Sequence, residues 1–142
     1  MASQNDVRRI ARSLPGAIEG KERFFFFVRN GAKERSFVWV WQERIDPKKA
    51  RVPNPRVLAV RVADLVEKDV LLAMDKDKFF TEPHYDGFPA ILVRLPAVGA
   101  GELRALIAGA WRCVAPRALM DRLDRPGEVS KKKAARSKKR AR

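Results

Sequence analysis

The fold is decided by the stretch FFTEPHYDGFPAILVRL at residues 79–95. Its aromatic pair, Phe79 and Phe80, closes a preceding helical pattern, and a polar loop rich in proline and glycine follows. The apolar run Ala90–Leu95 ends the stretch. A short apolar run bounded by glycine and proline is typical of a buried β-strand. We therefore expect a strand at 90–95 that joins a sheet built by the residues before it.

Three β-prone segments precede this strand. The first two, Arg23–Val28 and Ser36–Trp41, are separated by the turn dipeptide Asn30-Gly31, which favours a hairpin. The third, Val57–Val62, alternates apolar and polar residues. It follows a basic, proline-containing segment at Lys48–Pro55, which we expect to be a loop.

The second of these segments carries an aromatic alternation. A side-chain period of two places Phe37, Trp39 and Trp41 on one face of the strand, and Val38 and Val40 on the other. One face must meet the helices. The other is open to three interpretations: a contact with a second copy of the chain, a platform on which bases stack, or partial exposure to solvent. We expect an exposed apolar patch formed by these rings or by the phenylalanines opposite them.

Three helices flank the strands. The first begins at the N-cap Ser3 with Asp6 three residues on, and ends at Pro15-Gly16. The second is capped by Asp64 with Glu67, and the third begins near Gly101. The element order is therefore α-β-β-β-α-β-α, with room for a further short strand and for one more helical turn at Ala118–Leu123. The apolar positions of helical spacing that we expect to face inward are Val7, Ile10, Ala11 and Leu14, then Val66, Val70, Ala73 and Met74, then Leu103, Leu106, Ile107, Ala110, Trp111 and Val114.

The charge is concentrated at the C-terminal end. The chain has 142 residues and a net charge of +14, and residues 131–142 hold eight basic side chains and no acid. Residues 1–130 keep 23 basic and 17 acidic side chains, a net of +6. We therefore expect one domain at 1–123 and a disordered, Lys/Arg-rich tail at 124–142, because the tail cannot bury apolar surface to offset the entropy of ordering.

The composition also indicates a cytoplasmic protein. The single cysteine, Cys113, excludes an internal disulfide and suits a reducing compartment. The N-terminus lacks the apolar segment of a secretory signal. No apolar run approaches the roughly 18–20 residues that a membrane helix needs, so we expect no membrane partner.

No catalytic, cofactor-binding or metal-binding signature stands out. Glu82, His84 and Asp86 lie close together, but a metal site needs three or more converging ligands, and a loop histidine is more often a turn residue. Cys113 lies beside an apolar helix stripe, where we expect a half-buried inert thiol. The chain contains no GxGxxG, P-loop, GxSxG or CxxC motif. We expect no enzyme, no cofactor and no metal.

Four stretches occur together in this chain: FFTEPHYDGFPAILVRL at 79–95, AWRCVAP at 110–116, SLPG at 13–16 and FVWVW at 37–41. Through these stretches, residues 4–120 resemble the MmcQ/YjbR family. It implies an α+β fold, a two-layer sandwich with helices packed on one face of an antiparallel sheet, similar to secretion chaperones and bacterial frataxin-like proteins. Members are commonly called DNA-binding proteins, by analogy with a double-wing arrangement of strands. The resemblance implies no catalytic residues.

Charge and resemblance together favour a non-catalytic protein that binds nucleic acid, most simply double-stranded DNA, electrostatically and without sequence preference. Such a protein would be cytoplasmic and associated with the nucleoid. The alternative is a protein-interaction or chaperone-like module that uses an apolar sheet face. For the arginines of the first helix, the alternative to a nucleic-acid contact is a surface that only meets solvent. The candidate nucleic-acid-binding residues are Arg8, Arg9, Arg12, Lys48, Lys49, Arg51 and Arg56 in the body, and Lys131, Lys132, Lys133, Arg136, Lys138, Lys139, Arg140 and Arg142 in the tail.

Overall fold

The computed structural model describes residues 1–124. The eight tail cations proposed above, and nearly all of the expected tail at 124–142, lie outside the described residues. The elements in chain order are α1 (Gln4–Arg12), β1 (Ile18–Glu19), β2 (Phe25–Asn30), β3 (Lys33–Glu43), β4 (Val52–Arg61), α2 (Leu65–Met74), β5 (Phe79–Phe80), the short 3₁₀ helix η1 (Pro83–Tyr85), β6 (Ala90–Arg94), the 3₁₀ helix η2 (Leu95–Ala97), α3 (Ala100–Val114) and α4 (Arg117–Asp124).

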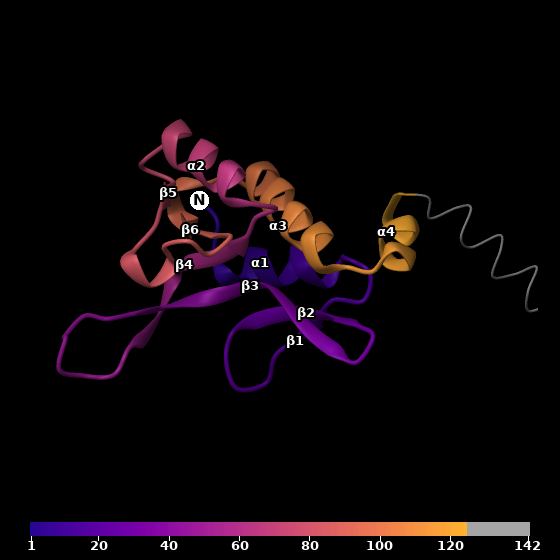
Figure 1. Cartoon of the computed structure of the whole chain (residues 1–142), viewed down its shortest axis with the longest axis horizontal. Coiled ribbons are helices and arrows are strands. Elements are labelled where there is room, and N and C mark those ends of the chain that lie inside the picture. The colour runs from indigo at the N-terminus through magenta and orange to yellow at the C-terminus, as the bar shows by residue number, and fades with distance from the viewer. Residues whose placement is uncertain (125–142) are drawn as a thin grey trace, which may run out of the picture.

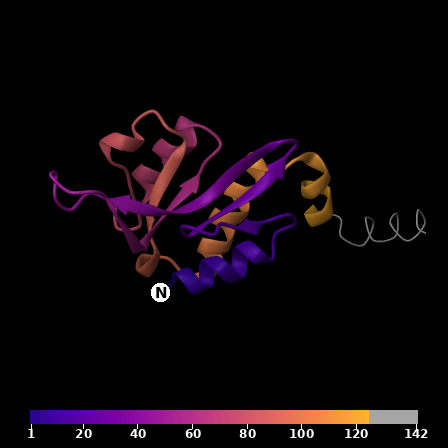
Figure 2. The ribbon, with the colours of Figure 1, turned by 90° about the horizontal axis from the view of Figure 1, so that it is seen from below.

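The strands form one six-stranded antiparallel sheet in the order β1-β2-β3-β4-β6-β5. Helices α1 and α3 lie side by side and pack on the sheet, as Figure 2 shows. The fold is therefore α+β, as expected. The larger core between sheet and helices contains helical positions expected to face inward, among them Val7, Ile10, Leu14, Leu103, Ile107 and Trp111, together with Val60 and Val93 from the expected strands.

The SLPG turn after α1 contacts helix α3. The indole nitrogen of the fully buried Trp111 donates a hydrogen bond to the carbonyl oxygen of Pro15, at 2.9 Å. Gly16 has a φ of +71°, which a side chain would strain, and a Cβ there would lie 2.5 Å from Leu119 of α4. The turn and the tryptophan are thus parts of one contact.

Several boundaries differ from the sequence-based expectation. Phe79 and Phe80 do not close a helical pattern but form β5, which pairs with Val93 and Leu92 at the sheet edge. Strand β4 begins at Val52, so the end of the expected loop at 48–55 is strand. Beyond the expected order, β1 and β5 add short edge strands and α4 adds a C-terminal helix.

A bulge corrects the expected faces of β3. Phe26 pairs with Val38 but Phe27 pairs with Ser36, so Phe37 is an extra residue in the ladder. Phe37 and Val38 therefore both belong to the larger core, while Trp39 and Trp41 contact the smaller cluster on the opposite face. The simple period of two is wrong for Phe37 because it assumes an uninterrupted register.

Helix α2 turns a different side inward from the one expected. Its cap is as expected, since the Asp64 side chain accepts a hydrogen bond from the Glu67 backbone at 2.8 Å. The residues expected inside, however, are exposed: Val66, Val70, Ala73 and Met74. The inward side carries Lys68, which is 4% exposed, with Leu71 and Leu72 packed against the larger core. The seven apolar residues of α2 surround much of the helix, so periodicity alone does not select the buried side.

No helix within residues 1–124 is long and apolar enough to cross a membrane.

Candidate nucleic-acid interface

The β3–β4 hairpin extends away from the body at the opposite end of the molecule from α4, as Figure 1 shows. The pairing of its two strands shifts register after Val40. Beyond this shift Trp41 pairs with Asn54, and Glu43 pairs with Val52. We call residues 44–56 the basic hairpin, because they contain five cations and one acid: Arg44, Lys48, Lys49, Arg51 and Arg56 against Asp46.

Internal contacts shape the tip of the basic hairpin. The Arg44 guanidinium donates hydrogen bonds to the carbonyl oxygens of Pro47 and Lys49, at 3.3 and 3.1 Å. The Asp46 carboxylate accepts one from the Lys48 backbone at 2.9 Å. These bonds hold the loop without using the ammonium groups of Lys48 and Lys49. Both lysines are exposed, and no ion pair joins them to another residue in 1–124.

The other two candidate cations of the hairpin have different surroundings. Arg51 is engaged: its guanidinium donates to the Gln42 carbonyl at 2.8 Å and pairs with Glu82 at 3.0 Å. Arg56 is exposed and lines a hollow of about 320 Å³ together with Arg94. Arg94 was missed by the sequence reasoning, because a charge at the end of an apolar strand carries no signal until β6 is placed beside β4.

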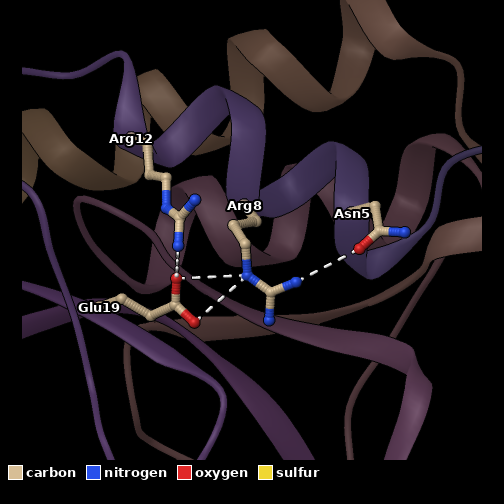
Figure 3. A network of polar contacts seen from close by, with 4 residues as sticks. All are labelled: Asn5, Arg8, Arg12 and Glu19. Carbon is tan, nitrogen blue, oxygen red and sulfur yellow. Dashed lines mark hydrogen bonds and ion pairs between the residues drawn. The ribbon is translucent and has the colours of Figure 1, made fainter.

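The arginines of α1 are paired with acids. Arg8 and Arg12 converge on one carboxylate, Glu19 of β1, at 3.2 and 2.9 Å, and Figure 3 shows this network. Arg9 pairs with Asp6 at 2.9 Å. A phosphate would have to compete with these carboxylates. The three α1 arginines are therefore engaged by acids, unlike Lys48 and Lys49 of the basic hairpin.

The second face of the sheet is only partly open. Trp41 packs there with Val57, Ala59, Ala90 and Leu92 under the ring of Tyr85 from η1. Phe27 and Trp41 are buried, whereas Phe25 and Trp39 remain half-buried. The expected aromatic patch is thus reduced to a pocket, because the 81–89 segment covers part of the face.

The reactive side chains do not assemble into a site. His84 is exposed in η1 and meets Tyr85 edge-on, with ring centroids 5.6 Å apart. Within residues 1–124 no three His, Cys, Asp or Glu residues could hold a metal ion. The Cys113 thiol is half-buried and donates to the Gly109 carbonyl at 3.2 Å, and burial raises its pKa. A raised pKa disfavours the thiolate, which is the nucleophilic form.

Comparison with known proteins gives relatives over most of the chain. It is 35% identical over 121 residues to the uncharacterized proteins Rv2570 of Mycobacterium tuberculosis and Mb2600 of Mycobacterium bovis, covering 84% of this chain and 94% of each relative. No family model matches the chain. The crystal structure of DR2400 from Deinococcus radiodurans, a DUF419 domain, superposes with a TM-score of 0.59 at 21% identity over 78% of this chain and 77% of that one. This last likeness supports the fold.

Proposed function

Because the chain belongs to the same family as the mycobacterial proteins Rv2570 and Mb2600, which are uncharacterized, we propose its function from its own surface: it is a non-catalytic protein of the MmcQ/YjbR type that binds double-stranded DNA. Binding is largely electrostatic and independent of sequence. In this proposal the protein works in the cytoplasm, in association with the nucleoid.

The observation that carries the proposal is the basic hairpin. It projects from the body, and its exposed cations Lys48, Lys49 and Arg56 have no carboxylate partner in 1–124. A projecting ribbon with free cations can contact phosphates on a duplex without desolvating an existing ion pair. Contacts to phosphate carry no sequence information, so the expected binding is non-specific and steeply dependent on salt.

A pair of triple variants tests this role. The slope of log affinity against log salt concentration changes by about 0.9 for each neutralised phosphate. Replacing Lys48, Lys49 and Arg56 with alanine should therefore make this slope for duplex binding shallower by about 2.7. The matched control replaces three exposed helix arginines, Arg104→Ala, Arg117→Ala and Arg122→Ala, and removes the same charge. Affinity is measured by fluorescence anisotropy on a labelled duplex over a salt series.

The proposal predicts that only the hairpin triple changes the slope. Equal losses in both triples would mean that net charge alone governs binding. If the salt slope of the hairpin triple variant is unchanged, the hairpin does not contact the duplex. Absence of duplex binding by the full chain at physiological salt would overturn the proposed function itself.

A second candidate function, protein interaction, is supported by one specific surface. Val66, Val70 and Met74 are 72%, 53% and 68% exposed and recur every four residues along α2. We call them the α2 stripe. Acidic residues lie in and beside the same helix, among them Asp64, Glu67, Asp69, Asp75 and Asp77. An apolar stripe with acidic surroundings suits a partner segment that is both apolar and basic.

This candidate can be tested with a synthetic amphipathic helix of leucine and lysine. The chain should bind that peptide, and Val66→Gln, Val70→Gln and Met74→Gln together should weaken binding at least tenfold. Because the three side chains are exposed, the free energy of unfolding of the triple variant should stay close to that of the wild type. Equal peptide affinity of the triple variant, or no binding by the wild type, would discard the α2 stripe as a docking face.

A further inference from the structure

The part of the second sheet face left open is a pocket of about 420 Å³, within the range of small-ligand sites. We call it the aromatic pocket. Its aromatic surfaces come from Phe25 of β2, Trp39 of β3 and Tyr85 of η1. Its polar surroundings include Arg23 from the loop before β2 and Arg51 from the basic hairpin. Segments distant in the sequence therefore meet around one hollow.

The rings of the aromatic pocket are held in place. Phe25 stacks on Phe27 with ring centroids 5.6 Å apart and an interplanar angle of 28°. Gly20 also lies against this ring, since a Cβ atom there would come within 1.9 Å of it. The glycine thus leaves room for the ring. A ring seated in this way loses little entropy when a flat ligand stacks on it.

Trp39 and Tyr85 support each other. The Trp39 indole nitrogen donates a hydrogen bond to the Tyr85 hydroxyl at 3.1 Å. Both rings meet Phe88 edge-on, and the Arg61 guanidinium lies 5.8 Å from the Trp39 ring centroid. Because the Tyr85 oxygen accepts from Trp39, its own proton points elsewhere, and no described group in 1–124 accepts it. A tyrosine hydroxyl is protonated at neutral pH, and burial raises the pKa of Tyr85 further, which favours the same donor.

The rim of the aromatic pocket adds free polar groups. Arg23 is exposed, and no described residue forms an ion pair or hydrogen bond with its side chain. The Gln42 side-chain amide likewise has no described partner in 1–124, while its backbone carbonyl accepts from Arg51. The pocket thus presents flat aromatic surfaces, neutral hydrogen-bonding groups and an unpaired guanidinium.

We propose that the aromatic pocket binds an unpaired nucleobase with its attached phosphate. The base would stack on Phe25 and Trp39 and bond through its polar edge to the Tyr85 hydroxyl or the Gln42 amide, while Arg23 meets the phosphate. Two sources share this chemistry, a free mononucleotide and an unpaired base of a single strand. The inference goes beyond the proposed function, which requires only the backbone of a duplex.

The test uses the full chain with three probes: 5′-dAMP, a ten-nucleotide single-stranded oligo-dA, and a blunt duplex of the same length. Binding is followed by calorimetry and by the indole N–H resonances in NMR. Ligand should shift the Trp39 resonance and leave that of the buried Trp111 in place. Tyr85→Phe and Arg23→Gln should each weaken nucleotide binding about three- to tenfold, the size of one hydrogen bond. Arg104→Gln, an exposed arginine of α3 outside the pocket lining, is the matched control.

Each outcome of this test either supports or overturns the inference. Binding of 5′-dAMP weakened by both pocket variants supports a mononucleotide site, and binding of the oligonucleotide alone with the same weakening supports a single-strand site. No shift at Trp39 with either probe overturns the inference, as does binding unaffected by Tyr85→Phe and Arg23→Gln. If the inference is overturned in either way but the duplex still binds in a salt-dependent manner, the proposed duplex-binding function stands. If the duplex does not bind but 5′-dAMP does, the pocket inference stands and the proposed function fails.

Discussion

At the residue scale, individual side chains secure contacts between segments far apart in the chain. Trp111 fills the larger core without exposure and donates its indole hydrogen to Pro15, 96 residues away in sequence. Lys68 is 4% exposed, and its ammonium donates to the carbonyls of Tyr85 and Phe88 at 2.6 and 3.1 Å. Burial lowers the pKa of Lys68, and the two carbonyls satisfy two of its three N–H donors.

Trp111→Ala should lower the free energy of unfolding by about 3–5 kcal/mol, because it opens a cavity in the larger core. The Pro15 carbonyl also loses its donor. Chemical denaturation measures the loss. Arg104→Ala on an exposed position of the same helix is the control and should stay within about 0.5 kcal/mol of the wild type. A loss well under 1 kcal/mol for Trp111→Ala would contradict its place in the core.

Lys68→Met should lower the free energy of unfolding by about 1.5–3 kcal/mol, the range for hydrogen bonds to a charged group. The carbonyls of Tyr85 and Phe88 would lose their donor, so amide hydrogen exchange should accelerate in residues 85–88. Lys76→Met, at an exposed lysine after the same helix, is the control. Unchanged exchange in 85–88 would show that Lys68 does not hold this segment.

At the element scale, the 81–89 segment determines what the second sheet face can do. It carries Tyr85 over the smaller cluster and leaves Phe25 and Trp39 as the open part. The basic hairpin adds Arg51 at the same hollow through its ion pair with Glu82. The covered sheet face is therefore a poor broad docking surface. The apolar surface that the sequence reasoning sought on the sheet lies instead on α2, as the α2 stripe.

At the scale of the whole molecule, the basic hairpin is set far from the last described helix (Figure 1). The basic hairpin and α4, which ends at Asp124, lie at opposite ends of the molecule along its longest axis (Figure 1). The eight basic residues of 131–142 follow α4 in the sequence. If both regions contact a duplex, their contributions should be separable.

Deleting residues 126–142 should flatten the salt dependence of duplex binding by about 7 if all eight cations of 131–142 are engaged, and by less for partial engagement. The thermal transition should barely move, because residues 126–142 are mostly basic and polar and have little apolar surface to bury. The loss should add to that of the hairpin triple variant. A truncated chain that binds as tightly as the full one, and prefers one sequence, would show that the folded body reads DNA by itself.

The amino-acid sequence by itself determined the α+β fold, the four principal strands, the three longer helices and eight members of the larger core. The strands, helices and core positions follow from periodicity and turn chemistry, which act over a few residues, as in the stripe from Leu103 to Val114. The α+β arrangement was implied by the family resemblance. Composition likewise located the excess positive charge.

Only the tertiary structure decided which faces and charges are free. The bulge at Phe37, the outward turn of the α2 stripe and the pairing of the α1 arginines with acids all depend on partners distant in the sequence. The aromatic pocket needs β2, β3, η1 and the basic hairpin together. The physical reason is that burial and ion pairing are properties of pairs of segments, and a single segment's pattern is compatible with several such pairings.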